Sequence, residues 1–345
     1  MSRSAGLSAH VMKRSTIFDI ARKLKLSPAT VSRALRDHPD ISEKTKKRIL
    51  AAAKELNYLP NPVARSLRNK TSSTIGVIVP EIRHDFFASA ISGIEDIAYA
   101  AGYTIIVCQS NEDPAREAVN VRTLAMNHVA GAIISISQGT TSSAHFKVLQ
   151  DFNVPFVFFD RVMDAFKASK VVVDDFGGAY SAVQYLLKAG YTTIAHLAGP
   201  EHLSISKERL RGYRMALKEN GGQAGGEIVV HGGMNEEDGL VGVDKLMKLV
   251  VKPDAIFAVN DPVALGAFKR LREHKKRIPE DVAIVGFSNN KTTELVDPPL
   301  TTVDQPSYEL GKKAAEVLLD QISGRNGLRP RTEVLKTRLI VRGST

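Results

Sequence analysis

The sequence has little cysteine and no long apolar run, and both absences limit the kind of protein it encodes. Cys108 is the single cysteine among 345 residues, which excludes a disulfide framework within the chain and a zinc site built from cysteines. A reducing compartment fits this composition. No apolar run approaches the ~18 residues of a membrane-spanning helix, and residues 1–12 lack the leucine-rich core of a signal peptide. We therefore expect a cytoplasmic protein.

Signatures of common enzymes are also missing. The sequence contains no P-loop, no glycine-rich dinucleotide motif after a strand and no G-x-S-x-G motif. Its nine histidines show no metal-ligand spacing. We therefore expect no catalytic residue, no cofactor and no metal, and an enzyme of the doubly wound α/β class remains a remote alternative.

Positive charge is concentrated in the first fifth of the chain. Residues 1–73 carry 16 Lys/Arg and 5 Asp/Glu, whereas the rest of the chain carries 31 and 32. Such a block suits a polyanion, because neutralising phosphates releases counterions. A solvated basic tail is the alternative, but helical patterns with apolar faces run through the block. One helix is predicted from its cap Ser42 to about Leu56. Its first turns carry a cluster of basic residues: Lys44, Lys46, Lys47 and Arg48. Positive charge at this end of a helix opposes the helix dipole, and a polyanion partner explains why it is there.

Two short amphipathic helical patterns joined by a tight turn occupy residues 15–35. Thr16 is the predicted cap of the first helix, and Ser27 caps the second, with Pro28 at its first position. The second helix is left with an outward face of small, hydroxyl and arginine side chains, as in a helix that enters a major groove: Ala29, Thr30, Ser32, Arg33 and Arg36. The pattern favours helix-turn-helix DNA binding, although such helix pairs also occur in proteins that never touch nucleic acid.

A short helix and a polar linker are predicted next. Asn61 and Pro62 are a cap and first-position pair for a helix that is too short to be stable alone. A plain interdomain tether is the alternative reading. The predicted domains are a disordered extension at 1–14, a helix-turn-helix domain at 15–60, a hinge helix and linker at 61–73, and a core at 74–345; Met12 is a candidate for the natural start.

From Ile75 onward, short runs of Val, Ile and Ala alternate with helical patterns. This alternation predicts parallel sheets in doubly wound α/β units. It restarts after about Asp174, so we expect two lobes, one of about 74–173 plus 305–325 and one of about 174–304 plus 330–342. A single last strand is predicted at Thr332–Val341. Ligands of such sheets bind outside the carboxyl ends of the strands, which places a small-molecule site between the lobes.

The chain resembles the LacI/GalR family of bacterial transcription repressors from Ser15 to about Val341. The resemblance rests on these motifs, in the family's order and spacing: TIFDIARKLKLSPATVSRAL, ISEKTKKRILAAAKELNYLPNPVARSL, IGVIVP, FFASAISGIEDIAYAAGY, GAI, VFFDR, HLAGP, ERLRGYRMAL, AVNDPVALGAF, IPEDVAIVGF and PPLTTVDQP. It implies a DNA-binding helix-turn-helix head, a hinge helix, and a two-lobed α/β core like that of a periplasmic sugar-binding protein.

The resemblance also assigns DNA contacts. Pro28, Ala29 and Arg33 fall on base-reading positions, where the first two are apolar and suit thymine methyl groups. Leu67 matches the hinge leucine that wedges into the minor groove, Ala64 keeps paired hinge helices close, and Arg65 and Arg68 face the DNA backbone. The remaining expected DNA-binding residues match positions at phosphates or groove walls: Thr16, Ile17, Ser27, Thr30, Ser32, Thr45, Tyr58 and Asn61.

For the cleft between the lobes, the resemblance implies an effector site. Phe86 and Phe87 match ring-stacking positions, and Arg209 matches the arginine that clamps ligand oxygens. The other expected effector-binding residues are Asp160, Arg161, Asn260, Asp261, Ser288 and Gln305, the last on a crossover strand. Each has an alternative role: the two phenylalanines could be core residues, Asp261 could cap a helix, and Asp160 and Arg161 could form a structural ion pair.

One position departs from the family pattern. Many members carry an aspartate after the Gly-Phe pair, where this chain has Ser288 followed by two asparagines. A serine bonds a sugar neutrally and more weakly than a carboxylate does, which leaves the ligand class open. The expected function is a nucleoid-associated repressor that binds a pseudo-palindromic operator as a homodimer, with a carbohydrate or sugar derivative as effector. A purine or other small metabolite is the alternative effector. A sugar-binding protein on the same core is a remote alternative function.

Overall fold

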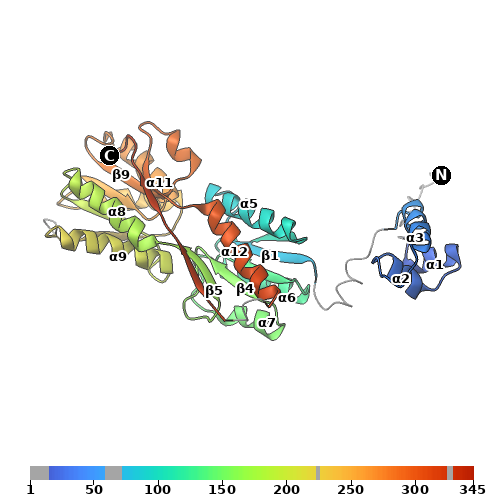
Figure 1. Ribbon diagram of the computed structural model, residues 1–345. Coiled ribbons are helices and arrows are strands. Elements are labelled where there is room, and N and C mark those ends of the chain that lie inside the picture. Colours follow the sequence, from blue (N-terminus) through green and yellow to red (C-terminus); the bar gives the residue numbers. More distant parts are fainter. Residues whose placement is uncertain (1–14, 59–71, 223–225, 325–328) are drawn as a thin grey trace, which may run out of the picture. The chain divides into compact units, whose positions relative to one another are not determined.

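The computed structural model describes residues 15–58, 72–222, 226–324 and 329–345 (Figure 1). It divides into two compact units, Met1–Lys70 and Thr71–Thr345. The predicted extension at 1–14 lies outside the described residues, and so do five predicted DNA contacts: Asn61, Ala64, Arg65, Leu67 and Arg68. In the described parts of the chain, no helix is long and apolar enough to cross a membrane.

Residues 15–58 of the first unit form a three-helix head whose predicted caps are confirmed. Its helices are α1 (Ile17–Leu24), α2 (Pro28–Ala34) and α3 (Glu43–Glu55). The Thr16 hydroxyl accepts from the Asp19 amide while the Asp19 carboxylate accepts from the Thr16 amide, so a complete capping box begins α1. Ser27 caps α2 in the same way, and its hydroxyl accepts from the Thr30 amide at 3.0 Å. The fully buried side chains of Ile20, Val31 and Ile49 join the three helices into one core.

The first lobe of the second unit is a six-stranded sheet with helices around it. Its strands follow the order β11-β5-β4-β3-β1-β2, and all neighbouring pairs are parallel. The elements are β1 (Thr74–Val79), α5 (Asp85–Ala100), β2 (Thr104–Gln109), α6 (Pro114–Met126), β3 (Gly131–Ile134), η1 (Ala144–Phe146), α7 (Lys147–Asp151), β4 (Phe156–Phe159), β5 (Ser169–Val173), α12 (Ser307–Ile322) and β11 (Thr332–Leu335). Glycine lets α12 pack closely on α5, because a Cβ added at Gly311 would lie 2.0 Å from the Ala90 carbonyl oxygen.

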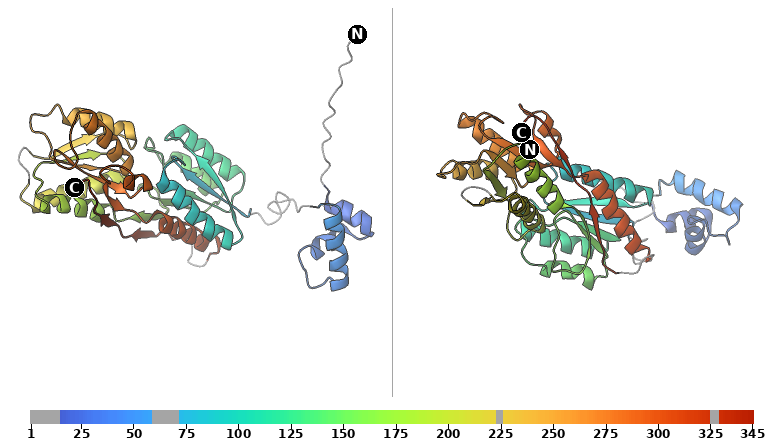
Figure 2. Two further views of the ribbon diagram at one scale, coloured as in Figure 1. Left: turned by 90° about the horizontal axis from the view of Figure 1, so that it is seen from above. Right: turned by 60° about the vertical axis from the view of Figure 1, so that its left-hand side comes forward.

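The second lobe repeats this plan. Its strand order is β12-β10-β9-β8-β6-β7, with β12 antiparallel to β10 and the other pairs parallel. The elements are α8 (Asp175–Lys188), β6 (Ile194–Ala198), α9 (Ser204–Glu219), β7 (Ile228–His231), α10 (Glu236–Leu246), β8 (Ala255–Ala258), α11 (Asp261–Glu273), β9 (Ala283–Ser288), η2 (Lys291–Glu294), β10 (Thr301–Asp304) and β12 (Arg338–Ile340). The doubly wound, two-lobed α/β architecture expected from the sequence is therefore confirmed (Figure 2).

The end of the chain differs from the predicted single strand at Thr332–Val341. It forms two short strands, β11 in the sheet of the first lobe and β12 in the sheet of the second. The C-terminal segment thus runs along both lobes (Figures 1 and 2). Residues 332–335 belong to the first sheet, although the predicted boundaries placed them in the second lobe. Gln305 likewise follows β10 directly instead of lying within a strand.

A buried histidine lies in the middle of the second sheet. His196, on β6, is fully buried, and its Nδ1 donates to the Phe257 carbonyl oxygen at 2.9 Å. Its ring stacks on that of Phe257 with centroids 4.8 Å apart, and its Nε2 has no hydrogen-bond partner among the described residues. Burial lowers the pKa of His196 to about 4, because the charged imidazolium would lose its hydration.

This pKa predicts a loss of stability in mild acid. The unfolded chain binds a proton at His196 with a pKa of about 6.5, whereas the folded chain resists protonation down to about 4. The free energy of unfolding should therefore fall by about 2 kcal/mol between pH 7 and pH 5 through this residue alone. Burial raises the pKa of Asp175 and of Asp261 to about 6. These two shifts act in the opposite direction, because they increase the free energy of unfolding as the pH falls.

The His196 contribution can be isolated with a His196→Gln variant. Urea denaturation of the wild type and the variant at pH 7, 6 and 5 gives two stability curves in which the aspartate contributions are shared. We expect the difference between the curves to change by about 2 kcal/mol over this range. Parallel curves would show that His196 is protonated equally well in the folded and unfolded chains.

Candidate functional site

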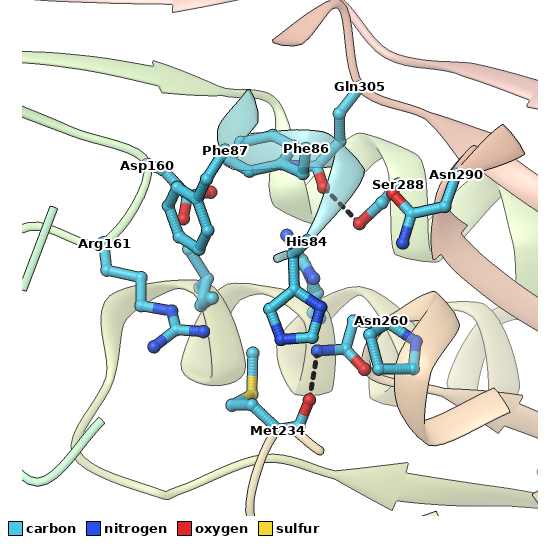
Figure 3. A pocket seen from close by; sticks show the side chains of 13 residues that line it. His84, Phe86, Phe87, Asp160, Arg161, Met234, Asn260, Ser288, Asn290 and Gln305 are labelled. Carbon is cyan, nitrogen blue, oxygen red and sulfur yellow. Dashed lines mark hydrogen bonds between the residues drawn. The ribbon is translucent and has the colours of Figure 1, made fainter. Parts of the chain in front are cut away.

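A pocket with about 410 Å³ of empty space, part of which is open to solvent, lies between the two lobes. Residues that follow the carboxyl ends of strands in both sheets line it, as expected for open parallel sheets. Figure 3 shows side chains of both lobes around this common space. The lining residues are His84, Phe86, Phe87, Asp160, Arg161, Ile205, Arg209, Met234, Asn260, Pro262, Ser288, Asn290 and Gln305. Of the nine predicted effector-binding residues, only Asp261 is not among them.

Asp261 is not among the lining residues, and its predicted role as the cap of a helix is wrong. It is fully buried, and its carboxylate accepts hydrogen bonds from the Thr302 hydroxyl at 2.6 Å and the Asn290 amide at 2.7 Å. The cap of α11 is Asn260, whose Oδ1 accepts from the Val263 amide at 2.9 Å. Asp261 therefore holds the segment that carries Asn290 in place and lies out of reach of the pocket space.

Two phenylalanine rings at the start of α5 form the apolar wall of the pocket. Phe86 and Phe87 pack edge to face with ring centroids 5.2 Å apart, and Phe87 also packs against Phe159. Both side chains are buried and belong to the core that α5 shares with the first sheet. Phe86 and Phe87 therefore line the pocket and also belong to the hydrophobic core.

Arg209 reaches the pocket from α9 but is held by the protein. Its Nε and Nη2 lie 2.8 and 2.7 Å from Asp175 Oδ1, and its Nη1 donates to the Val259 carbonyl oxygen at 2.5 Å. The guanidinium lies 3.8 Å from the centroid of the Phe287 ring, and the residue is 1% exposed. Asp175 is buried as well, and burial raises its pKa to about 6, which the adjacent guanidinium partly offsets.

Arg161 is paired with Glu112 instead of Asp160. Its Nη1 lies 2.7 and 2.9 Å from the two carboxylate oxygens of Glu112, so the predicted alternative of an Asp160–Arg161 ion pair is wrong. Burial raises the pKa of the Asp160 carboxyl group. The backbone of Asp160 has a positive φ of 57°. Sequence reasoning missed Glu112 and Asp175, because each lies far along the chain from its arginine and nothing local marks the pairing.

Neutral polar groups form the side of the pocket next to the second sheet. The Ser288 hydroxyl donates to Gln305 Oε1 at 2.9 Å, and Asn260 Nδ2 donates to the Met234 carbonyl oxygen at 2.8 Å (Figure 3). Two buried donors of lining residues, Gln305 Nε2 and Arg161 Nε, have no partner within the described part of the chain. Both atoms have almost no exposed surface, so a ligand reaches them only after a shift of the side chain.

The head presents most of its predicted DNA-binding residues at the surface. Thr16, Ser27, Pro28, Ala29 and Arg33 are exposed. The partly buried ones are Ile17, Thr30, Ser32, Thr45 and Tyr58. The outward face of α2 expected from the sequence is therefore present, and the DNA contacts of these side chains stay a prediction.

Lys46 does not belong to the exposed basic cluster. It is 8% exposed, and its ammonium group binds the carboxylates of Asp37 and, at 3.0 Å, Glu43. The hydrogen bond that Lys46 donates to Asp37 raises the pKa of Lys46, so this lysine stays charged inside the head. Its role is to connect the segment after α2 to the start of α3, whereas Lys44, Lys47 and Arg48 remain exposed.

Similarity to known proteins agrees with this architecture. Residues 16–61 match the family model of bacterial regulatory proteins, lacI family, and residues 183–345 match a periplasmic binding protein-like domain. The chain is 33% identical over 332 residues to the HTH-type transcriptional repressor CytR of Escherichia coli, which covers 96% of each protein. It is 33% identical over 312 residues to the transcriptional repressor PurR of Vibrio atlanticus, covering 90% of this chain and 93% of that protein.

Solved structures show the same similarity across both units. The lac repressor dimer bound to operator and the anti-inducer ONPF aligns with a TM-score of 0.83 and 28% identity, covering 96% of this chain and 99% of that one. The complex of the transcriptional regulator CelR with cellobiose aligns with a TM-score of 0.74 and 29% identity, covering 96% and 100%. The chain therefore belongs to the lacI family of bacterial regulatory proteins, a family of DNA-binding transcriptional repressors.

Proposed function

We propose that this chain binds a pseudo-palindromic operator as a homodimer, and that a small neutral polyhydroxylated ligand in the pocket controls its affinity for DNA. A sugar or an uncharged sugar derivative is the ligand class that the pocket fits best. The observation that carries this proposal is the charge balance of the pocket, in which each arginine already has its own carboxylate.

The charge balance argues against an anionic ligand. Arg161 is neutralised by Glu112 and Arg209 by Asp175, so neither guanidinium offers a free positive charge. Burial lowers the pKa of His84, which keeps its imidazole neutral at pH 7. A phosphate or carboxylate would therefore lose its hydration without gaining a matching cation.

Hydroxyl groups suit the remaining surfaces. Asn260, Ser288 and Gln305 line the pocket with neutral amide and hydroxyl groups, which can exchange hydrogen bonds with the hydroxyl groups of a ligand. The rings of Phe86 and Phe87 can cover the C–H face of a sugar. A purine or nucleoside remains the second candidate, because the same two rings can pack against a heterocycle.

The relatives support the other parts of the proposal. The lac repressor structure is a dimer on operator DNA, and the CelR structure is a complex with cellobiose. In this chain, the exposed side chains of α2 are the candidates for reading bases, while Lys44, Lys47 and Arg48 are candidates for phosphates. Because such a protein acts on chromosomal DNA, we infer a cytoplasmic location.

A thermal-shift screen of the full chain tests the ligand class. The panel pairs neutral mono- and disaccharides with their phosphates and uronic acids, and adds nucleosides and nucleobases. A ligand at 100 times its Kd should stabilise the protein by about 2.7 kcal/mol. We expect a neutral sugar to raise the Tm and its phosphate to have no effect.

The matched variants are Gln305→Ala, which removes a lining donor, and Val250→Ala, at a fully exposed position of the second lobe. The shift caused by the sugar should shrink in the first variant and persist in the second. A shift by a phosphate but not by its parent sugar would refute the neutral ligand, and a nucleoside shift alone would favour the second candidate.

A further inference from the structure

Two hydrogen bonds cross directly from one lobe to the other beside the pocket. His202, between β6 and α9 of the second lobe, has its Nε2 2.6 Å from the carbonyl oxygen of Gln138 in the first lobe. The Lys291 amide of the second lobe donates to Asp85 Oδ2, at the start of α5, at 3.2 Å. A carbonyl oxygen only accepts, so the His202 Nε2 must carry the proton that it donates.

The segment that contains Gln138 is fixed by carboxylates of the first lobe. The Gln138 amide donates to Glu112 Oε2 at 2.6 Å. The Ser137 amide and the Thr140 hydroxyl donate to the buried carboxylate of Glu117 at 2.6 and 2.9 Å. The position of the Gln138 carbonyl oxygen, and hence its bond to His202, therefore depends on these two carboxylates.

Glu112 also binds the pocket arginine. The oxygen that accepts from the Gln138 amide lies 2.9 Å from Arg161 Nη1, and the second oxygen lies 2.7 Å from it. A continuous series of hydrogen bonds thus leads from the pocket wall to the contact between the lobes: Arg161, Glu112, Gln138 and His202. The side chains of Arg161 and Glu112 are largely buried, so water does not compete strongly for the bonds between them, whereas the His202–Gln138 bond is exposed.

We propose that the His202–Gln138 hydrogen bond is a latch that holds the lobes closed, and that Arg161 and Glu112 report ligand occupancy to it. The reporting step rests on the proposed function, since it requires a ligand in the pocket. A ligand that contacts Arg161 in the pocket fixes the guanidinium on Glu112, which orders the Gln138 segment and strengthens the latch. Because the latch exists only in the closed arrangement, it also raises ligand affinity by the same factor.

Distance measurements between spin labels test the latch without ligand or DNA. Labels are attached to Val119→Cys in the first lobe and Val250→Cys in the second, positions that are 63% and 100% exposed, in a Cys108→Ser background. The labelled full-length chain is mixed with excess unlabelled protein, so that distances within one chain dominate. Loss of one hydrogen bond should raise the population of open, differently spaced lobes roughly fivefold.

His202→Ala should therefore show a second population of distances, and His202→Gln, which keeps an N–H donor at a similar reach, should restore the original distribution. Glu112→Gln keeps the shape of the side chain but removes the charge that holds Arg161, and it should open the lobes with His202 intact. An unchanged distribution in His202→Ala would overturn the latch, and an unchanged one in Glu112→Gln would overturn the connection to the pocket. A failed ligand screen with opened lobes in His202→Ala would refute only the proposed ligand class.

Discussion

The Arg209→Ala variant should lose about 3–5 kcal/mol of stability in the core and should no longer bind any ligand in the pocket. The substitution leaves the Asp175 carboxylate buried without its cation and the Val259 carbonyl oxygen without a donor. It also removes the guanidinium that lies on the Phe287 ring. Urea denaturation of the full chain measures the stability, and the thermal shift caused by a neutral sugar measures binding.

A double variant separates the two roles of Arg209. Arg209→Met with Asp175→Asn removes both charges of the buried pair and keeps most of its volume. Replacing a buried ion pair by neutral groups of similar volume is often harmless, so the double variant should recover most of the lost stability. It should still fail to bind the ligand, because the lining guanidinium is gone. If Arg209→Ala alone cost less than about 1 kcal/mol, the ion pair would be solvated and the structural role would be wrong.

Local signals account for the parts of the fold that the sequence predicts well. A cap is a contact between neighbours in the chain, so Thr16 and Ser27 mark their helices without knowledge of the fold. The strand Ala255–Ala258 and the helix Ser307–Ile322 also have local signals. Both are strongly patterned, the strand by continuous burial on two faces and the helix by an apolar stripe.

Weak or long-range signals account for what was missed. The strand β5 alternates between buried and half-buried residues, so it lacks the continuous apolar run of its neighbours. The edge strand β11 alternates between exposed and half-buried residues, and its assignment to the first sheet depends on pairing with β5. The partners of the pocket arginines lie 34 and 49 residues away in the chain, and only the fold brings them together.

Lys46 shows the same limit inside the head. In the sequence it is one of four basic residues at the start of α3, and the positive charge of this cluster favours a contact with phosphate. The structure instead places its ammonium group between Asp37 and Glu43. A charge cluster in a sequence therefore predicts a polyanion partner for the surface as a whole, but not for each residue.

The Arg33→Ala variant should lower affinity for specific DNA about 10- to 100-fold while leaving the head folded. Arg33 is exposed on α2, and its side chain makes no hydrogen bond or ion pair within residues 15–58, so its removal breaks no internal contact. A bidentate arginine–guanine contact contributes about 1–3 kcal/mol of discrimination between bases. Fluorescence anisotropy against a fragment selected from random DNA by the wild-type protein, and against a scrambled fragment, measures both affinities.

Lys54→Ala is the matched control, because it removes the same charge from an exposed position in the last turn of α3. Both variants should weaken binding to the scrambled fragment slightly, since each has one positive charge fewer. Only Arg33→Ala should reduce the ratio of specific to scrambled affinity, because discrimination requires a contact to base edges and not to phosphates. An equal loss on both fragments would make Arg33 a phosphate contact. The reading of bases would then rest on Pro28 and Ala29, whose apolar side chains offer only thymine methyl contacts.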